Sequence, residues 1–84
     1  MKIGVAGSLE SNDALITVKE AEGISISIRS IVYDFFKAQI ESAVRDTLSE
    51  MKIDNISVEV DDKGALDYTI KARLMTAIAR MEEV

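Results

Sequence analysis

The period of the apolar residues changes at Ser30, and this change limits the folds that the chain can adopt. Before it, residues 24–29 (ISISIR) alternate without an error, which is typical of a half-buried strand with its isoleucines facing inward. After it, apolar residues recur at spacings of three and four, which predicts a helix over residues 31–52 with Ser30 as its N-cap. The helical stripe consists of Val32, Phe36, Ile40, Ala43, Val44, Thr47, Leu48 and Met51.

Shorter patterns predict the remaining elements. Residues 3–9 alternate and residues 14–18 are apolar and partly β-branched, so we expect two strands that the polar residues 10–13 join into a hairpin. Residues 55–60 (NISVEV) alternate again and predict another strand. Residues 65–82 fit a helix over a longer stretch than they fit a strand. The first of these strands places Ile3, Val5, Gly7 and Leu9 on one face.

The order of these elements is β-β-β-α-β-α, which defines an α+β fold. A small antiparallel sheet with two helices packed on one face is the economical way to bury the apolar sides. Residues 20–23 (EAEG) are expected to turn, with Gly23 free to adopt a positive φ. The 84 residues contain no Pro, no linker and no internal repeat, so we expect one domain over residues 1–84.

Charge and composition exclude several classes of function. Lys and Arg number 10 against 15 Asp and Glu, and this net charge of −5 argues against nucleic acid or an anionic membrane surface as a partner. The absence of Cys and His excludes disulfides, thiolate nucleophiles and the usual hydrolase triads, which disfavours a stand-alone enzyme. The N-terminal segment is too short for a signal peptide and no apolar run reaches transmembrane length, so the expected location is the cytoplasm.

The polar segment at residues 10–13 (ESND) is the first candidate site. On local features it is most simply a hairpin turn. Its functional interpretation is that Ser11 is displayed to a modifying enzyme between two acidic flanks, Glu10 and Asp13. The chain lacks the usual base that would turn this hydroxyl into a catalytic nucleophile, so the functional interpretation makes Ser11 a substrate to which another enzyme attaches a group.

The segment at residues 61–64 (DDKG) is the second candidate. It either ends the strand and caps the next helix, or it forms a contact patch for a basic partner. The oxygen ligands at fixed spacing that a calcium loop needs are absent, so we predict no metal site. A third feature is the aromatic cluster of Tyr33, Phe35 and Phe36, which we interpret as covering the edge of the sheet rather than as a subunit contact.

Two separated segments together resemble one known family. Residues 6–13 (AGSLESND) and 60–66 (VDDKGAL) resemble the AG[ST]LESxD and VDDKGAL segments of the acyl carrier protein (gamma subunit) of citrate lyase. Residues 71–74 (KARL) are also similar, and the similarity extends over essentially the whole chain. The pattern differs from that of ordinary acyl carriers, which are four-helix bundles with Asp-Ser-Leu at a helix start, so the resemblance does not imply a bundle.

The resemblance implies a covalent cofactor on Ser11. In this family the carrier serine is esterified by 2'-(5''-phosphoribosyl)-3'-dephospho-CoA, whose thiol carries acetyl and then citryl as a thioester. The residue at this position of the pattern is Ser11, and Glu10 and Asp13 become candidate recognition flanks for the prosthetic-group transferase. Asn12 stands where relatives often have a second Ser, which removes a competing hydroxyl.

The resemblance also implies the partners and the reaction. A transferase (alpha) subunit would exchange acetyl for citrate on the arm, and a lyase (beta) subunit would release oxaloacetate, so that citrate is cleaved to acetate and oxaloacetate. The carrier itself is not catalytic. The alternative is an interaction or regulatory module that binds a subunit of a multisubunit complex by its sheet, with no prosthetic group and with Ser11 as a mere turn residue.

Two structural expectations complete the sequence-based interpretation. We expect residues 10–13 to be the most mobile internal segment, because no apolar side chain anchors them and because Glu10 and Asp13 repel one another. We also expect the first helix to bury Phe36, Ile40, Val44 and Leu48 against the strands. The strand residues expected in that contact are Ile24, Ile26, Ile28, Ile56 and Val58.

Overall fold

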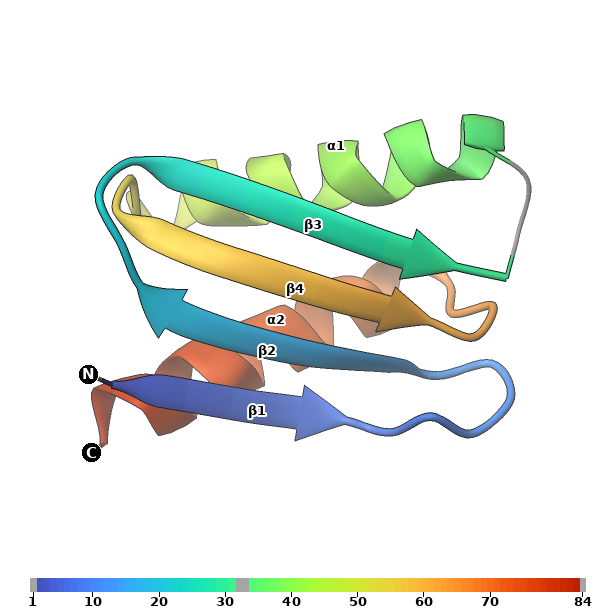
Figure 1. The fold of residues 1–84 in the computed structure, drawn as a ribbon, viewed down its shortest axis with the longest axis horizontal. Helices are drawn as coiled ribbons and strands as arrows, with labels where there is room; N and C mark the ends of the chain where they lie inside the picture. The colour runs from blue at the N-terminus through green and yellow to red at the C-terminus, as the bar shows by residue number, and fades with distance from the viewer. Residues whose placement is uncertain (1, 32–33, 84) are drawn as a thin grey trace.

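The structure is a computed structural model that describes residues 2–31 and 34–83. Figure 1 shows both helices on the same side of one twisted sheet, so the predicted α+β fold and its order of elements are confirmed, and the chain is not a helical bundle. Residues 32–33 and the side chain of Phe35 lie outside the described part, and with them most of the predicted aromatic cluster. The elements are β1 (Ile3–Gly7), β2 (Ala14–Glu20), β3 (Ile24–Ser30), α1 (Asp34–Glu50), β4 (Ile56–Asp62) and α2 (Asp67–Glu82).

The sheet is mixed rather than wholly antiparallel. Its strand order is β1-β2-β4-β3: β2 pairs antiparallel with both β1 and β4, whereas β3 and β4 run parallel. The expectation of an antiparallel sheet is therefore wrong at one pair, because α1 returns the chain to the end at which β3 began. The turn from β2 to β3 spans the start of β4, where the backbone N–H of Ile56 donates to the Gly23 carbonyl at 2.9 Å. Gly23 has a φ of 72°, as the sequence predicts.

The core lies between the helices and one face of the sheet. Ile40, Val44 and Leu48 of α1 are buried as predicted. Phe36 and Ile24 are each 37% exposed, so their predicted burial is wrong. The reason is that β4 occupies the centre of the sheet and leaves β3 at the edge. The side chains buried on the strands and on α2 are Ala6, Ala14, Ile16, Val18, Ile56, Val58, Val60, Ile70, Leu74, Ala77, Ile78 and Met81.

The helices begin later than the sequence pattern suggests. Ser30 does not cap α1, because it is the last residue of β3 and its hydroxyl donates to Asp62 Oδ2 at 2.8 Å. Leu66 rather than an acidic residue is the N-cap of α2, and it makes no side-chain capping bond. Leu66 is 59% exposed, so it also lies outside the core stripe of α2.

The close packing of β1 against α2 determines which side chains β1 buries. A Cβ atom on Gly4 would lie 1.9 Å from the Ala77 carbonyl oxygen, so no larger residue fits at this position without a shift of the helix. The inward positions of β1 are accordingly Gly4 and Ala6. Its bulky side chains, Ile3 and Val5, project from the opposite face of the sheet, which no helix covers.

Candidate modification site

The two segments that resemble the acyl carrier pattern meet at one end of the sheet. The β1–β2 loop contains Ser11, and the β4–α2 loop lies at the same end of the molecule (Figure 1). The backbone N–H of Asn12 donates to the Lys63 carbonyl at 2.8 Å, and the N–H of Lys63 donates to the Asp13 carbonyl at 2.9 Å. The antiparallel ladder between β2 and β4 thus continues into the two loops and joins them.

Ser11 lies exposed at the tip of its loop. The backbone N–H of Asp13 donates to the Glu10 carbonyl at 3.2 Å and closes a tight turn around Ser11 and Asn12. Asn12 has a φ of 65°, a left-handed conformation that Asn tolerates better than most residues. Among the residues that the structure describes, none forms a hydrogen bond with the Ser11 hydroxyl. The hydroxyl is therefore accessible to a modifying enzyme.

Asp13 anchors this loop to α2. Arg73 Nε donates to Asp13 Oδ1 at 2.9 Å, and Arg73 Nη2 donates to Oδ2 at 3.2 Å. The Ser8 hydroxyl donates to Asp13 Oδ2 at 2.8 Å, and the Ala14 backbone N–H donates to Oδ1 at 2.7 Å. The side chain of Asp13 is only 16% exposed, which makes it a support of the loop.

The charged partner changes the titration of Asp13. The hydrogen bonds from Arg73, then from Ser8 and from the Ala14 backbone, lower the pKa of Asp13 to about 2. The hydrogen bonds that Arg73 donates to Asp13, together with the negative charge of that carboxylate, raise the pKa of Arg73. The loop therefore has a polar anchor although it lacks an apolar one, because the charge of Asp13 is paired with Arg73. The expectation that residues 10–13 are the most mobile internal segment stays a prediction. The loop is held at its base, and Ser11 projects from its tip.

This carboxylate makes the folded state sensitive to acid. The pKa of Asp13 is about 2 in the folded protein, below the ordinary value of about 3.9 that we expect in the unfolded chain. The unfolded chain therefore takes up this proton first as the pH falls, and the contribution of Asp13 to stability is lost between about pH 4 and pH 2. In Asp13→Asn we expect a shallower loss of stability over this range, measured as urea midpoints at a series of pH values.

Glu10→Gln is the matched control for this prediction. It removes one carboxylate from the same loop and leaves the pair between Asp13 and Arg73 in place. Its urea midpoint should therefore decline with acid much as that of the unaltered chain does. An equally steep decline in Asp13→Asn would contradict the role assigned to the Asp13 carboxylate.

Asp62 stabilises the loop between β4 and α2 through buried hydrogen bonds. Its side chain is 1% exposed, accepts a hydrogen bond from the Ser30 hydroxyl at 2.8 Å, and accepts another from the Ala65 backbone N–H at 2.9 Å. Both predictions for residues 61–64 need correction. Asp61 and Asp62 extend β4 instead of ending it, neither caps α2, and Asp62 is too deeply buried to belong to a contact patch.

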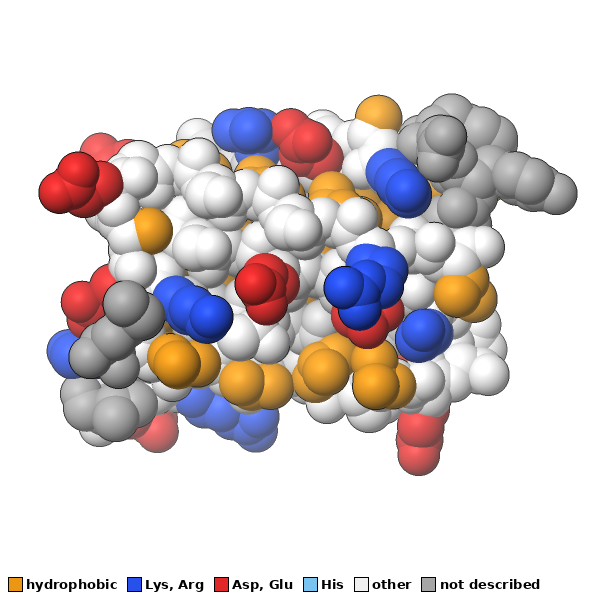
Figure 2. Space-filling view, in the orientation of Figure 1, with side chains coloured by type: hydrophobic (Ala, Val, Ile, Leu, Met, Phe, Trp, Pro, Cys, Tyr) orange, Lys and Arg blue, Asp and Glu red, His pale blue; other side chains and the backbone are white. Residues whose placement is uncertain are grey.

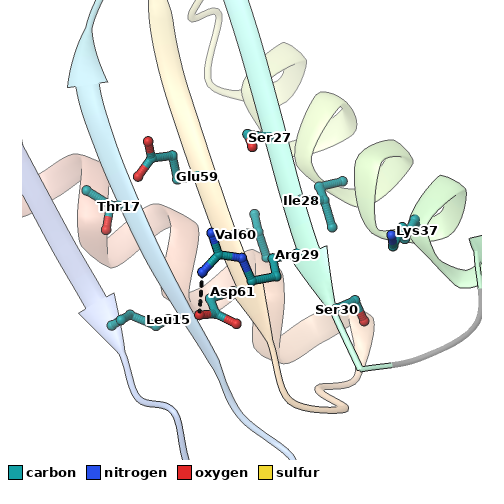
Figure 3. Close-up of a pocket in the computed structure, with 10 residues that line it drawn as sticks. All are labelled: Leu15, Thr17, Ser27, Ile28, Arg29, Ser30, Lys37, Glu59, Val60 and Asp61. Carbon is teal, nitrogen blue, oxygen red and sulfur yellow. Dashed lines mark ion pairs between the residues drawn. The ribbon is translucent and has the colours of Figure 1, made fainter.

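A separate hollow of about 420 Å³ lies on the open face of the sheet (Figure 3). Arg29 extends over the hollow, with its Nη1 atom 4.0 Å from Asp61 Oδ2. Glu59 points into the same region. These charges have mixed sign, and two of them already pair with each other. The hollow therefore does not present the uniform charge that would favour an ionic ligand.

The part of the chain that the structure describes has neither a membrane-spanning helix nor a cluster of metal ligands. Neither α1 nor α2 is long and apolar enough to cross a membrane. Across residues 2–31 and 34–83, no group of three or more acidic side chains is arranged to hold a metal ion.

Comparison with known proteins identifies the family. Residues 1–81 match the family described as "Malonate decarboxylase delta subunit (MdcD)". A citrate lyase acyl carrier protein of Fusobacterium nucleatum is 48% identical over 83 residues, which are 96% of this chain and 88% of that protein. The citrate lyase acyl carrier protein of Treponema denticola is 42% identical over 79 residues, 94% of this chain and 91% of that protein.

The fold also has a counterpart among solved structures. A chain in the crystal structure of a Pseudomonas malonate decarboxylase hetero-tetramer with malonate has a TM-score of 0.79 and 16% identity, with coverage of 95% of this chain and 84% of that chain. The fold and the curated relatives together define an acyl carrier subunit of the α+β type rather than a helical bundle. The chain belongs to the citrate lyase acyl carrier protein family. Membership implies a covalently attached prosthetic group.

Proposed function

We propose that this chain is the acyl carrier subunit of a citrate lyase, and that Ser11 is the residue that holds its prosthetic group. The observation that carries the proposal is the exposed Ser11 at the tip of a loop that Asp13, Arg73 and the Lys63 backbone hold in place. The curated relatives at 42% and 48% identity are citrate lyase acyl carrier proteins, which supports the same reaction here. The proposal includes a single carrier domain over residues 1–84 and a cytoplasmic location.

The residues present fit the proposed prosthetic group. The Ser11 hydroxyl is exposed, and the described residues do not engage it, so it can be esterified by 2'-(5''-phosphoribosyl)-3'-dephospho-CoA without disturbing the fold. The group would supply the terminal thiol that holds acetyl or citryl, a thiol that a chain without Cys cannot provide. Because the chain also lacks His, the chemistry belongs to the transferase (alpha) and lyase (beta) subunits, and this subunit only carries.

The acidic flanks have different parts in this proposal. Glu10 is exposed beside Ser11 and is free to contact the prosthetic-group transferase. Asp13 is mostly covered by its bonds to Arg73 and Ser8, so it contributes to recognition by fixing the shape of the loop. The transferase would then meet a preformed turn with one accessible hydroxyl at its tip.

The intact mass of the protein tests the proposed function. The chain is produced together with a prosthetic-group transferase and its nucleotide precursor, and its mass is compared with that of the chain produced alone. We expect one phosphoribosyl-dephospho-CoA adduct, located by peptide mapping on the fragment that contains Ser11. A chain that gains no adduct but still assembles with its subunits would instead be an interaction module without a prosthetic group.

A further inference from the structure

The open face of the sheet is polar except along β1 and at Leu15 of β2. The other outward side chains of β2, Thr17 and Lys19, are polar and lie beside Val5 and Ile3. On β3 and β4, the side chains that point away from the helices are polar: Ser25, Ser27, Arg29, Ser57, Glu59 and Asp61. On β1 the corresponding side chains are Ile3 and Val5, which are 45% and 42% exposed. This difference lies within one sheet face, so it does not follow from the packing of the helices.

The apolar side chains follow β1 toward the modification site, with Leu15 of β2 beside the gap that Gly7 leaves between Val5 and Leu9. Val5 pairs with Thr17, and the next position outward pairs Gly7 with Leu15, so Leu15 of β2 lies beside the end of the β1 row. Leu9, 54% exposed, continues the chain from β1 into the loop two residues before Ser11. Figure 2 shows a row of hydrophobic side chains along this margin of the face, with the charged side chains above it. We call Ile3, Val5, Leu9 and Leu15 the apolar strip.

The fold itself does not require bulky apolar residues in the strip. α2 approaches β1 so closely that the inward side of this strand is complete with Gly4 and Ala6. Serines serve at the equivalent outward positions of β3, the other edge strand. Exposed isoleucine and valine on an edge strand favour unwanted association, so their presence indicates a surface that another molecule covers.

At Val5 the free edge of β1 is already occupied by a side chain of α2. Arg80 Nη1 donates to the Val5 carbonyl oxygen at 2.8 Å, so this backbone group of the edge strand is already paired within the chain. Addition of a further strand at this point would have to displace Arg80. The side chains of the strip remain available to a partner.

Charge distinguishes between two protein occupants of the strip. Two copies of this chain, each with a net charge of −5, repel one another, which argues against a homodimer. Four side chains suit the apolar centre of an interface with a different protein, where about 800 Å² per partner is typical and a polar rim surrounds the centre. The strip ends at the loop that carries Ser11, so a protein seated on it has its own surface beside the modified residue.

We propose that the apolar strip docks this chain to a catalytic subunit of its complex, one that presents an apolar patch and acts on the acyl group carried at Ser11. This inference rests on the proposed function. The strip provides a fixed contact along the sheet face, and the loop beyond Leu9 presents the arm to the docked subunit.

Substitutions inside and outside the apolar strip test the docking surface. Val5→Asp places a charge in the centre of the strip, and Ser27→Asp places the same charge on the polar part of the open face as a matched control. Val5→Thr keeps the β-branched shape and serves as a second variant should Val5→Asp fail to fold, as judged by circular dichroism. Dissociation constants are measured by calorimetry against the purified transferase and lyase subunits of citrate lyase.

The expected result is a loss of affinity of about tenfold or more for one of these subunits with Val5→Asp, because transferring a carboxylate from water into an apolar contact costs free energy. Val5→Thr should weaken binding less, and Ser27→Asp should leave the affinity unchanged. Equal affinity of Val5→Asp and the unaltered chain would overturn the proposal. The proposal would also be overturned if sedimentation showed that the unaltered chain is a dimer and that Val5→Asp is a monomer.

The intact mass of the same variants separates this inference from the proposed function. Val5→Asp should still acquire the adduct on Ser11, because the loop and its anchor at Arg73 are unchanged. A variant that loses the adduct yet binds both subunits normally would assign the strip to the modifying enzyme and would overturn the proposal. An unaltered chain without an adduct would contradict the proposed function, whichever way the binding measurements turn out.

Discussion

Ser11→Ala is expected to abolish attachment of the prosthetic group and to leave the fold unchanged. The substitution removes only a hydroxyl that is exposed and that the described residues do not hydrogen-bond. It leaves the bonds of Asn12 and Asp13 at the base of the loop intact. Intact mass after production with the prosthetic-group transferase should show no adduct, while circular dichroism and the urea midpoint match those of the unaltered chain.

Ser8→Ala is the matched control in the same loop. The Ser8 hydroxyl donates to Asp13 Oδ2 at 2.8 Å and accepts from the Glu10 backbone N–H at 3.3 Å, so its loss loosens the base of the loop without removing Ser11. Attachment should remain largely unaffected in this variant. Peptide mapping that placed the adduct on Ser8, or on any serine other than Ser11, would show that the assignment is wrong.

The local patterns of the sequence predict the elements better than their arrangement. The alternation at residues 24–29 correctly predicts β3, and the change of period at Ser30 correctly predicts the helix that follows. No local pattern indicates which strands become neighbours. β4 lies between β2 and β3 in the sheet, although it is the last of the four strands along the chain. The strand with the most regular alternation consequently lies at an edge, and Ile24 is exposed there.

At the candidate site, the sequence likewise does not predict which side chains contact one another. The resemblance singles out Ser11, and the structure places it on an accessible turn, but no pattern in the sequence assigns Arg73 its role as the partner of Asp13. Arg73 is separated from Asp13 by 60 positions in the sequence, and Ser30 from Asp62 by 32. The sequence predicts that Asp61 and Asp62 end the strand, because nothing local shows how a buried Asp62 would be hydrogen-bonded. Its partners are Ser30, on another strand, and the backbone of Ala65, after the predicted turn.

The core prediction with the largest expected effect concerns Ile40. This residue is 4% exposed at the interface of α1 with the rest of the core, and it belongs to the part of the helical stripe that the structure confirms. Truncation to Ala leaves a cavity beside the sheet and should cost about 2–5 kcal/mol of the free energy of unfolding. A chain of 84 residues has a total stability of only about 4–13 kcal/mol by the usual value per residue.

Ile40→Ala should therefore lower the urea midpoint far more than a substitution next to it on the same helix. Gln39→Ala is the matched control: Gln39 is exposed, and Ala favours the helix, so its midpoint should change little. The measurement is urea denaturation followed by circular dichroism, with the slope checked so that a shift in midpoint reports stability. Equal midpoints for the two variants would mean that α1 does not depend on its apolar stripe for its place on the sheet. Because Ile40 lies outside the Ser11 loop, the fraction of Ile40→Ala that remains folded should still accept the prosthetic group.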